Sequence, residues 1–173
     1  MNFSIERSLE ILSRTPDSLE VLLSGLNDVW ISNNEGPDTW SPYDIVGHLV
    51  HGEKTDWMER TDIILNRKDK HFRPFDRFAQ FTESKGKTLN DLLKEFKQLR
   101  MNNIKTLKSL NLNEEKLNLK GIHPKFGEVT LKQLLSTWTI HDLNHISQIC
   151  RVMAKQYKEA AGPWIEYLPI LNK

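Results

Sequence analysis

Segments in which apolar residues recur every three or four positions dominate this chain and restrict it to a helical fold. Residues at this spacing share one face of an α-helix, and an apolar face must pack against other helices. Runs that alternate apolar and polar residues, as strands do, are scarce. The sequence therefore predicts an all-α fold. The clearest stripe comprises Leu89, Leu92, Leu93, Phe96, Leu107 and Leu110.

Capping signals divide this pattern into helices. Ser4 is predicted to begin a short first helix. Thr15 and Pro16 are predicted to interrupt it and begin a new segment, because threonine caps helices and proline suits their first turn. Ser41, with Asp44 three positions later, forms a capping box for a second long helix that should run to about residue 66.

Thr88 and Thr130 mark the starts of a third and a fourth long helix. The fourth should run to about residue 157, before Gly162 and Pro163 stop it. Glycine and proline punctuate residues 33–38 and 111–129, so both stretches are expected to be loops.

The connection between the second and third helices, residues 67–87, is polar and long for a helical bundle. A helix of about 24 residues measures roughly 36 Å at 1.5 Å per residue. The connection is long enough to return along that length, and we therefore expect the second and third helices to run parallel.

Composition narrows the range of functions. The chain has 173 residues, enough for one domain, 1–173, with a four-helix core. Its 24 basic and 23 acidic residues give a net charge of +1, which does not indicate a nucleic-acid partner or an anionic membrane surface. No apolar run approaches the roughly 18 residues of a membrane span. A single cysteine excludes an internal disulfide framework, and a cytoplasmic setting is expected.

His141 and His145 lie four residues apart, on one face of the fourth helix. That spacing lets two imidazoles reach the same ion. They continue the apolar seam of this helix, where unpaired polar groups destabilise a fold, and a shared metal ion would provide a partner for both. The apolar seam comprises Leu131, Leu134, Leu135, Trp138, Ile149 and Val152.

A third ligand should face inward from another helix. At 100° per residue, His48 lies at the edge of the apolar face of the second helix, whereas His51 lies about 60° further toward solvent. Gly52 lacks a side chain and could leave room for a ligand. We therefore predict a metal site formed by His48, His141 and His145. The alternative is that these are core histidines bonded to carboxylates or to the backbone, and His71 and His123 are expected at the surface.

Two stretches resemble the DinB/YfiT-like family. One runs from Trp40 through His48-Leu49-Val50-His51-Gly52-Glu53, and the other from Trp138 through His141-Asp142-Leu143-Asn144-His145 to Tyr157. The resemblance covers nearly the whole chain and combines one histidine of the second helix with the HxxxH of the fourth.

The resemblance implies a four-helix bundle in up-down-down-up order with a long crossover between helices two and three. It also implies a three-histidine site for one divalent ion, nickel or zinc, at His48, His141 and His145, and a homodimer. Relatives include transferases that use a low-molecular-weight thiol as cosubstrate, such as bacillithiol transferases.

The combined prediction is a metal-dependent S-transferase acting on small electrophiles. The alternatives are a metal-dependent hydrolase and a non-catalytic module that binds metal or a small molecule. Arg100 and Asn103 fall on the apolar stripe of the third helix, where the arginine needs either an anionic ligand or a bundle acid such as Glu53 or Asp56. These two residues and Trp138, one turn before His141, are the candidate substrate contacts.

Overall fold

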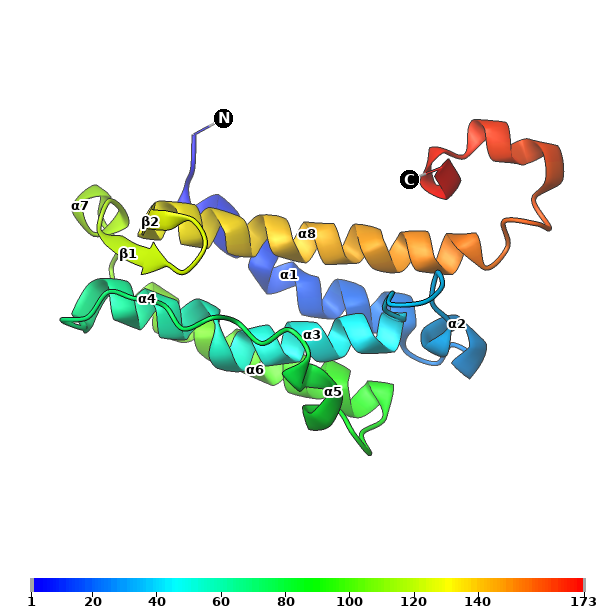
Figure 1. Cartoon of the computed structure of the whole chain (residues 1–173), viewed down its shortest axis with the longest axis horizontal. Coiled ribbons are helices and arrows are strands. Elements are labelled where there is room, and N and C mark those ends of the chain that lie inside the picture. The colour runs from blue at the N-terminus through cyan, green and yellow to red at the C-terminus, as the bar shows by residue number, and fades with distance from the viewer. Residues whose placement is uncertain (1, 173) are drawn as a thin grey trace.

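Four long helical rods pack side by side in the computed structural model, which describes residues 2–172 (Figure 1). The first, third and fourth rods are single helices, and the second is a pair. The four rods are α1 (Ile5–Leu23), α3 with α4 (Pro42–Thr55 and Trp57–Asn66), α6 (Leu89–Ser109) and α8 (Leu131–Lys155). The shorter elements are α2 (Asp28–Ser32), α5 (Ala79–Glu83), α7 (Glu114–Leu117), β1 (Lys120–His123), β2 (Gly127–Thr130), and the 3-10 turns η1 (Gly162–Tyr167) and η2 (Pro169–Asn172).

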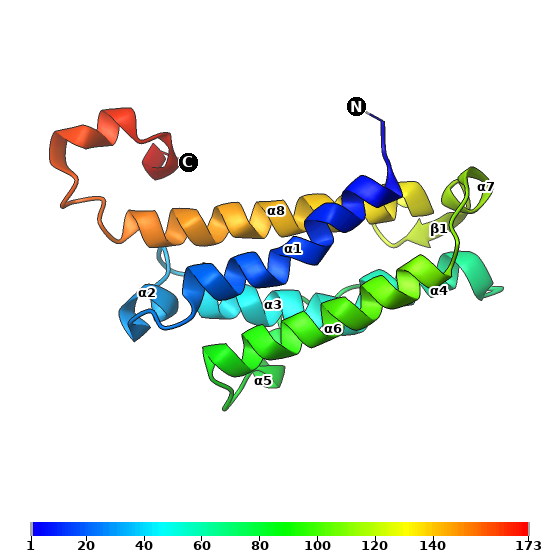
Figure 2. The same cartoon turned by 180° about the vertical axis from the view of Figure 1, so that it is seen from behind.

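The rods run in up-down-down-up order, as predicted. Helices α1 and α8 point one way, whereas the α3–α4 pair and α6 point the other way (Figures 1 and 2). The parallel helices α3 and α6 are in contact. Between them, residues 67–88 return along the α3–α4 rod and include the short helix α5. The long polar connection is therefore the crossover that this topology requires.

The predicted starts of the later helices are confirmed. Ser41, Thr88 and Thr130 each accept a bond from the backbone three residues on, and the side chain there bonds back to the cap. Such reciprocal boxes satisfy amide groups that a helix leaves without partners at its N-terminus. No helix of the described residues is long and apolar enough to cross a membrane.

The predicted break at Thr15 and Pro16 is wrong, because α1 continues through the proline. Proline has no amide hydrogen, so the carbonyl oxygen of Leu12, four residues earlier, loses its helical partner. The Arg100 guanidinium donates to that oxygen through Nη1, at 2.9 Å. A side chain from α6 thus satisfies the carbonyl that the proline leaves free.

The second rod was predicted as one helix and is divided at Asp56. The Thr55 hydroxyl donates to the carbonyl oxygen of His51 at 2.9 Å, a local bond of the kind that bends helices. The bend lies beside Gly52, where an added Cβ would stand 3.4 Å from the indole nitrogen of Trp57. The Trp57 ring therefore packs directly against the backbone of Gly52.

Residues 111–129 were predicted as loop and instead contain α7 and the greater part of a β-hairpin. Strands β1 and β2 pair antiparallel, with Lys120 opposite Thr130. The crossover joins this hairpin: the Phe72 amide donates to the Ile122 carbonyl at 2.9 Å, and the Ile122 amide donates to the Lys70 carbonyl at 2.8 Å. The hairpin therefore fixes the start of the crossover against the bundle.

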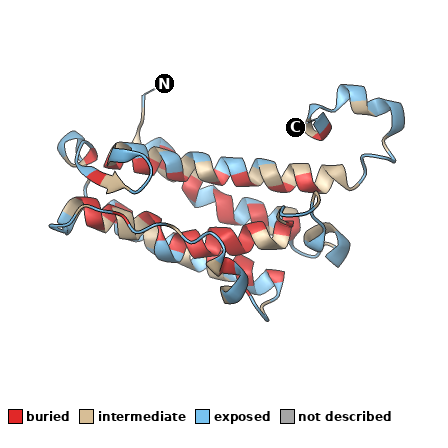
Figure 3. Ribbon diagram, viewed as in Figure 1, coloured by how far each residue is buried: buried red, intermediate tan, exposed pale blue. Residues whose placement is uncertain are grey.

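A layer of buried polar side chains divides the apolar core into two clusters, and the inward faces of all four rods are buried (Figure 3). On α6, Phe96 belongs to one cluster and Ile104 to the other, with Arg100 between them. On α8, the same division falls between Trp138 and Ile149. The candidate histidines and their neighbours lie in this layer.

Candidate metal centre

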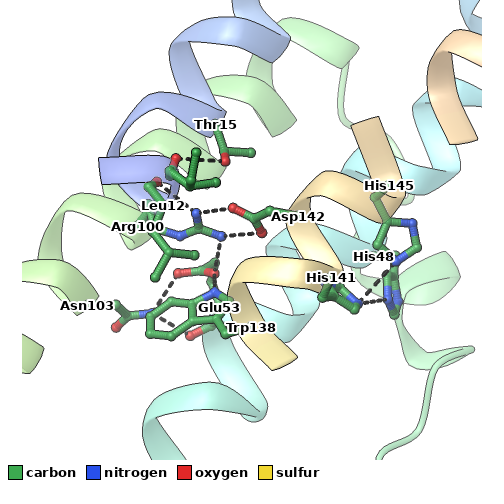
Figure 4. A network of polar contacts seen from close by, with 11 residues as sticks. Leu12, Thr15, His48, Glu53, Arg100, Asn103, Trp138, His141, Asp142 and His145 are labelled. Atoms are coloured by element: carbon green, nitrogen blue, oxygen red, sulfur yellow. Dashed lines mark hydrogen bonds and ion pairs between the residues drawn. The ribbon is translucent and has the colours of Figure 1, made fainter. Parts of the chain in front are cut away.

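Three histidines from two helices converge in the polar layer (Figure 4). His48 comes from α3, and His141 and His145 come from successive turns of α8. The Nε2 atom of His141 lies 3.1 Å from Nε2 of His48 and 3.1 Å from Nε2 of His145. One ligand nitrogen from each ring lies within 4.8 Å of the other two. The predicted convergence of these three residues is therefore observed.

Hydrogen bonds between the rings cannot satisfy this arrangement. The Nδ1 atom of His145 faces Oε1 of Gln148 at 2.8 Å, so Nδ1 carries the proton and Nε2 has a free lone pair. The Nε2 atom of His141 then has one hydrogen at most for two neighbouring nitrogens. The Nδ1 atoms of His48 and His141 are buried without a hydrogen-bond partner.

Burial keeps the three rings neutral. It lowers the pKa of His48 to about 3 and the pKa of His141 to about 2, and the neighbouring histidines act in the same direction. The pKa of His145 is also lowered by burial, although its bond to Gln148 opposes the shift. Neutral imidazole is the form that binds a metal ion.

The spacing of the nitrogens fits a shared ion. Ligands about 2.0–2.1 Å from a tetrahedral zinc ion stand roughly 3.3 Å apart, close to the two separations involving His141. When His48 and His141 carry their protons on Nδ1, as His145 does, a cation between the rings would accept the Nε2 lone pairs of all three. Cluster geometry and donor type therefore both fit a divalent metal.

His51 was expected to point toward solvent, and this was wrong because its side chain is buried. Its Nδ1 atom lies 2.9 Å from Oε1 of Glu83, and its Nε2 atom lies 3.3 Å from the Thr55 hydroxyl. Both ring nitrogens are thus engaged outside the three-histidine cluster. His48 rather than His51 belongs to the cluster, and the solvent exposure predicted for His51 is wrong.

Next to the cluster, Arg100 is the centre of a buried polar network (Figure 4). Its guanidinium donates to both carboxylate oxygens of Asp142, at 2.5 and 2.9 Å, and to Oε1 of Glu53 at 2.8 Å. Asn103 donates to Oε2 of Glu53 at 2.9 Å, and the indole of Trp138 donates to Oε1 at 3.1 Å. With the Leu12 carbonyl, the network joins all four rods.

These contacts correct the expected roles of Arg100, Asn103 and Trp138. The alternative for Arg100, pairing with a bundle acid, is what the structure shows, and the arginine is 1% exposed. Trp138 is fully buried and stacks on Trp57 at 5.7 Å between centroids. None of the three is among the described residues that line the cavity at the histidines. Their polar groups bond to the protein itself.

A cavity of about 480 Å³ opens beside His48 and His141. Small-molecule sites commonly have this size and a largely apolar lining. Aromatic rings from the second rod, the crossover and the hairpin line this cavity, together with three charged side chains. The rings belong to Trp57, Phe72, Phe75, His123 and Phe126, and the charged residues are Asp56, Arg60 and Arg77.

His123 was expected at the surface and is instead half-buried in this wall. Its ring stacks on Phe126 with 4.5 Å between centroids. The signal that sequence reasoning missed is the hairpin itself, since β1 carries His123 back over the second rod. Gly121 marks this close approach, because an added Cβ there would meet the Phe72 ring.

Comparison with known proteins agrees with this architecture. Residues 11–149 match the sequence model of the DinB superfamily. Among solved structures, the fold is similar to that of YfiT from Bacillus subtilis, with a TM-score of 0.76 and 19% identity over 90% of each chain. That protein is described as a probable metal-dependent hydrolase with an unusual four-helix bundle topology. No curated protein matches the chain.

Proposed function

The chain belongs to the DinB superfamily, and from that premise we propose that His48, His141 and His145 bind one divalent metal ion that activates a small nucleophile. The observation that carries the proposal is the convergence of three imidazole Nε2 atoms, for which His141 has at most one hydrogen to share between its two neighbours. Imidazole suits nickel and zinc, the two ions we expect.

Three protein ligands favour a catalytic rather than a structural centre, because such a site keeps a position open for another molecule. An ion held there lowers the pKa of a bound water or thiol toward neutrality. The cavity beside His48 and His141 gives a small molecule access to that position.

The protein's own residues orient and insulate the centre. Gln148 fixes the tautomer of His145, and the Trp57 ring packs against His141 with 5.1 Å between centroids. Two carboxylates and one guanidinium in the Arg100 network leave one buried negative charge, and Asp142 directly follows His141. That excess charge partly offsets the charge of a bound cation.

Of the reactions open to such a centre, we propose transfer of a thiol to a small electrophile. The thiol loses its proton to solvent, its sulfur forms a bond to the electrophilic carbon, and the leaving group departs with the electrons of the bond it breaks. Thiolates bind zinc and nickel well, which favours the ionised thiol at neutral pH. The resemblance to thiol-dependent transferases supports the same assignment.

A metal-dependent hydrolase is the second candidate, and the description of YfiT favours it. Elemental analysis of protein purified without an affinity tag should find one divalent ion per chain. Transfer is tested by mixing a low-molecular-weight thiol with a halonitrobenzene and following the thioether product by its absorbance. Hydrolysis is tested by the release of nitrophenol from a nitrophenyl ester. Metal-dependent turnover of the first substrate supports the transferase. Turnover of the ester alone supports the hydrolase, and metal binding without turnover of either overturns both.

A further inference from the structure

The charges that line the cavity do not cancel. Asp56 and Arg60 form an ion pair, with 2.6 Å between the carboxylate Oδ1 and the guanidinium Nε. Arg77 also lines the cavity, and no carboxylate of the described residues lies within ion-pair distance of it. The lining therefore carries one uncompensated positive charge before any metal ion is bound.

Arg77 lies near the histidines as well as in the wall. Its guanidinium carbon stands 4.7 Å from the centroid of the Phe78 ring, which supports the side chain from one side. Its positive charge acts on His48. Phe75, two residues earlier in the crossover, contacts the same histidine with 5.6 Å between ring centroids. The crossover thus brings a cation and an aromatic ring to the mouth of the metal centre.

The remaining wall is suited to a flat apolar molecule. Trp57, Phe72, Phe75 and Phe126 present aromatic rings to the cavity, and Val129 and Leu134 add aliphatic surface. The Phe126 side chain is 70% exposed at the hairpin turn, so the wall leaves apolar surface uncovered. Aromatic side chains recognise flat ligands by stacking as well as by burial.

We propose that this cavity binds a small organic anion with a flat apolar body, an aryl carboxylate in its simplest form, and that Arg77 selects the anionic group. The inference rests on the proposed function, because the anionic group and the flat body would belong to the electrophile that the metal centre receives, next to the carbon that carries its leaving group. A guanidinium presents two parallel donors that match a carboxylate. A cationic ligand would meet Arg77 and the metal ion as like charges.

Equilibrium binding of two probes tests the proposal. The probes are 2-naphthoate and the uncharged 2-naphthamide, which share one ring system and differ in charge. Titration of the zinc-loaded protein, followed by tryptophan fluorescence and calorimetry, should show at least tenfold tighter binding of the naphthoate. Equal binding of the two probes, or binding of neither at millimolar concentration, overturns the proposal.

Two arginines of the crossover provide a matched pair of variants. Arg77→Gln should abolish most of the preference for naphthoate while leaving the binding of naphthamide unchanged. Arg73→Gln removes an exposed arginine that lines a neighbouring cavity and not this one, and it should keep the preference. Equal effects of the two substitutions would show a general charge effect and overturn the assignment to Arg77.

Two further measurements locate the binding site and separate the two proposals. Phe126→Ala should weaken the binding of both probes by the same factor, because the ring would contact the apolar body that they share. Unchanged binding would exclude this cavity as the binding site. The titrations are repeated on metal-free protein. A naphthoate preference that depends on Arg77 should persist without zinc, so failure of the metal site leaves this result intact. Loss of the Arg77 effect without zinc would assign the selection to the ion and overturn the inference.

Discussion

Two groups of buried polar side chains share one layer of the bundle, and they differ in how fully their hydrogen bonds are satisfied. In the Arg100 network, nearly all hydrogen-bond donors and acceptors bond to other groups of the protein. The three-histidine cluster places nitrogens against one another and leaves two Nδ1 atoms without partners. Each group combines buried side chains with one half-buried member, His141 in the cluster and Asn103 in the network, so burial alone does not explain the difference.

The difference separates a structural role from a binding role. A buried charge without partners strongly destabilises a fold, and a paired set of charges fixes the elements that contribute to it. Arg100 bonds to groups from α1, α3 and α8, and no donor is free for a ligand except Nε. The histidines, in contrast, need something from outside the chain.

The largest expected effect is on the network. Arg100→Ala leaves two buried carboxylates unpaired and should lower the free energy of unfolding by about 3–5 kcal/mol. Urea denaturation followed by circular dichroism measures the change. The control is Lys97→Ala, which removes a surface cation that bonds Asp17 and Glu20 on α1 and should change stability little. Similar losses from both variants would contradict a special role for the buried network.

Next in size is the effect of single histidines on metal affinity. His48→Ala should weaken zinc binding by at least about 100-fold, because it leaves only two ligands. His51→Ala should leave zinc content nearly unchanged, since its nitrogens bond to Glu83 and Thr55. Competition with a chelating dye measures both affinities. Equal losses would place the ion elsewhere.

A smaller effect is expected from the group that orients His145. Gln148→Ala removes the acceptor for Nδ1, and loss of such a partner weakens metal binding by about 10-fold. Ser147→Ala, at an exposed neighbouring position on α8, provides the control. If the two variants bind zinc alike, the ring of His145 is held by packing rather than by Gln148.

The smallest effect concerns Asp56, a buried carboxylate that belongs to neither group. Burial raises its pKa to about 6, although Arg60 opposes the shift. Between about pH 4 and 6 the folded chain therefore holds more protons than the unfolded chain, and this carboxylate makes stability fall as pH rises. Asp56→Asn should stabilise the protein at pH 7.5, where the buried carboxylate is ionised, and change its stability little at pH 3.5, where the carboxyl group is protonated in the folded chain. Urea midpoints at both pH values test this, and a destabilised variant at pH 7.5 would show that the Arg60 pair dominates.

Sequence periodicity correctly predicted which side chains share one face of a single helix. The spacing of His141 and His145 and the position of His48 on the second rod follow from 100° per residue, and their convergence is observed. The position of His51 was misjudged because Glu83 of the crossover covers that side of α3. Periodicity describes one helix at a time and does not include segments that fold over it.

The remaining differences also involve partners distant in sequence. Strand β1 pairs with a nearby strand but is fixed by Phe72, in the crossover, and this brings His123 to the cavity. The inward position of Arg100 was predicted from its own helix. That it pairs with Glu53 and Asp142 rather than with a ligand depends on how three other rods pack around it. A one-dimensional pattern holds no signal for such long-range pairs.

The proline of α1 has a consequence for how this chain can change over generations. Because Pro16 withholds an amide, the Leu12 carbonyl depends on a guanidinium that comes from α6. Loss of the arginine strands that oxygen in the core, whereas replacement of the proline restores a local donor. Arg100 is therefore harder to replace while Pro16 is present, because its loss then removes the partner of the Leu12 carbonyl as well as that of the Glu53 and Asp142 carboxylates.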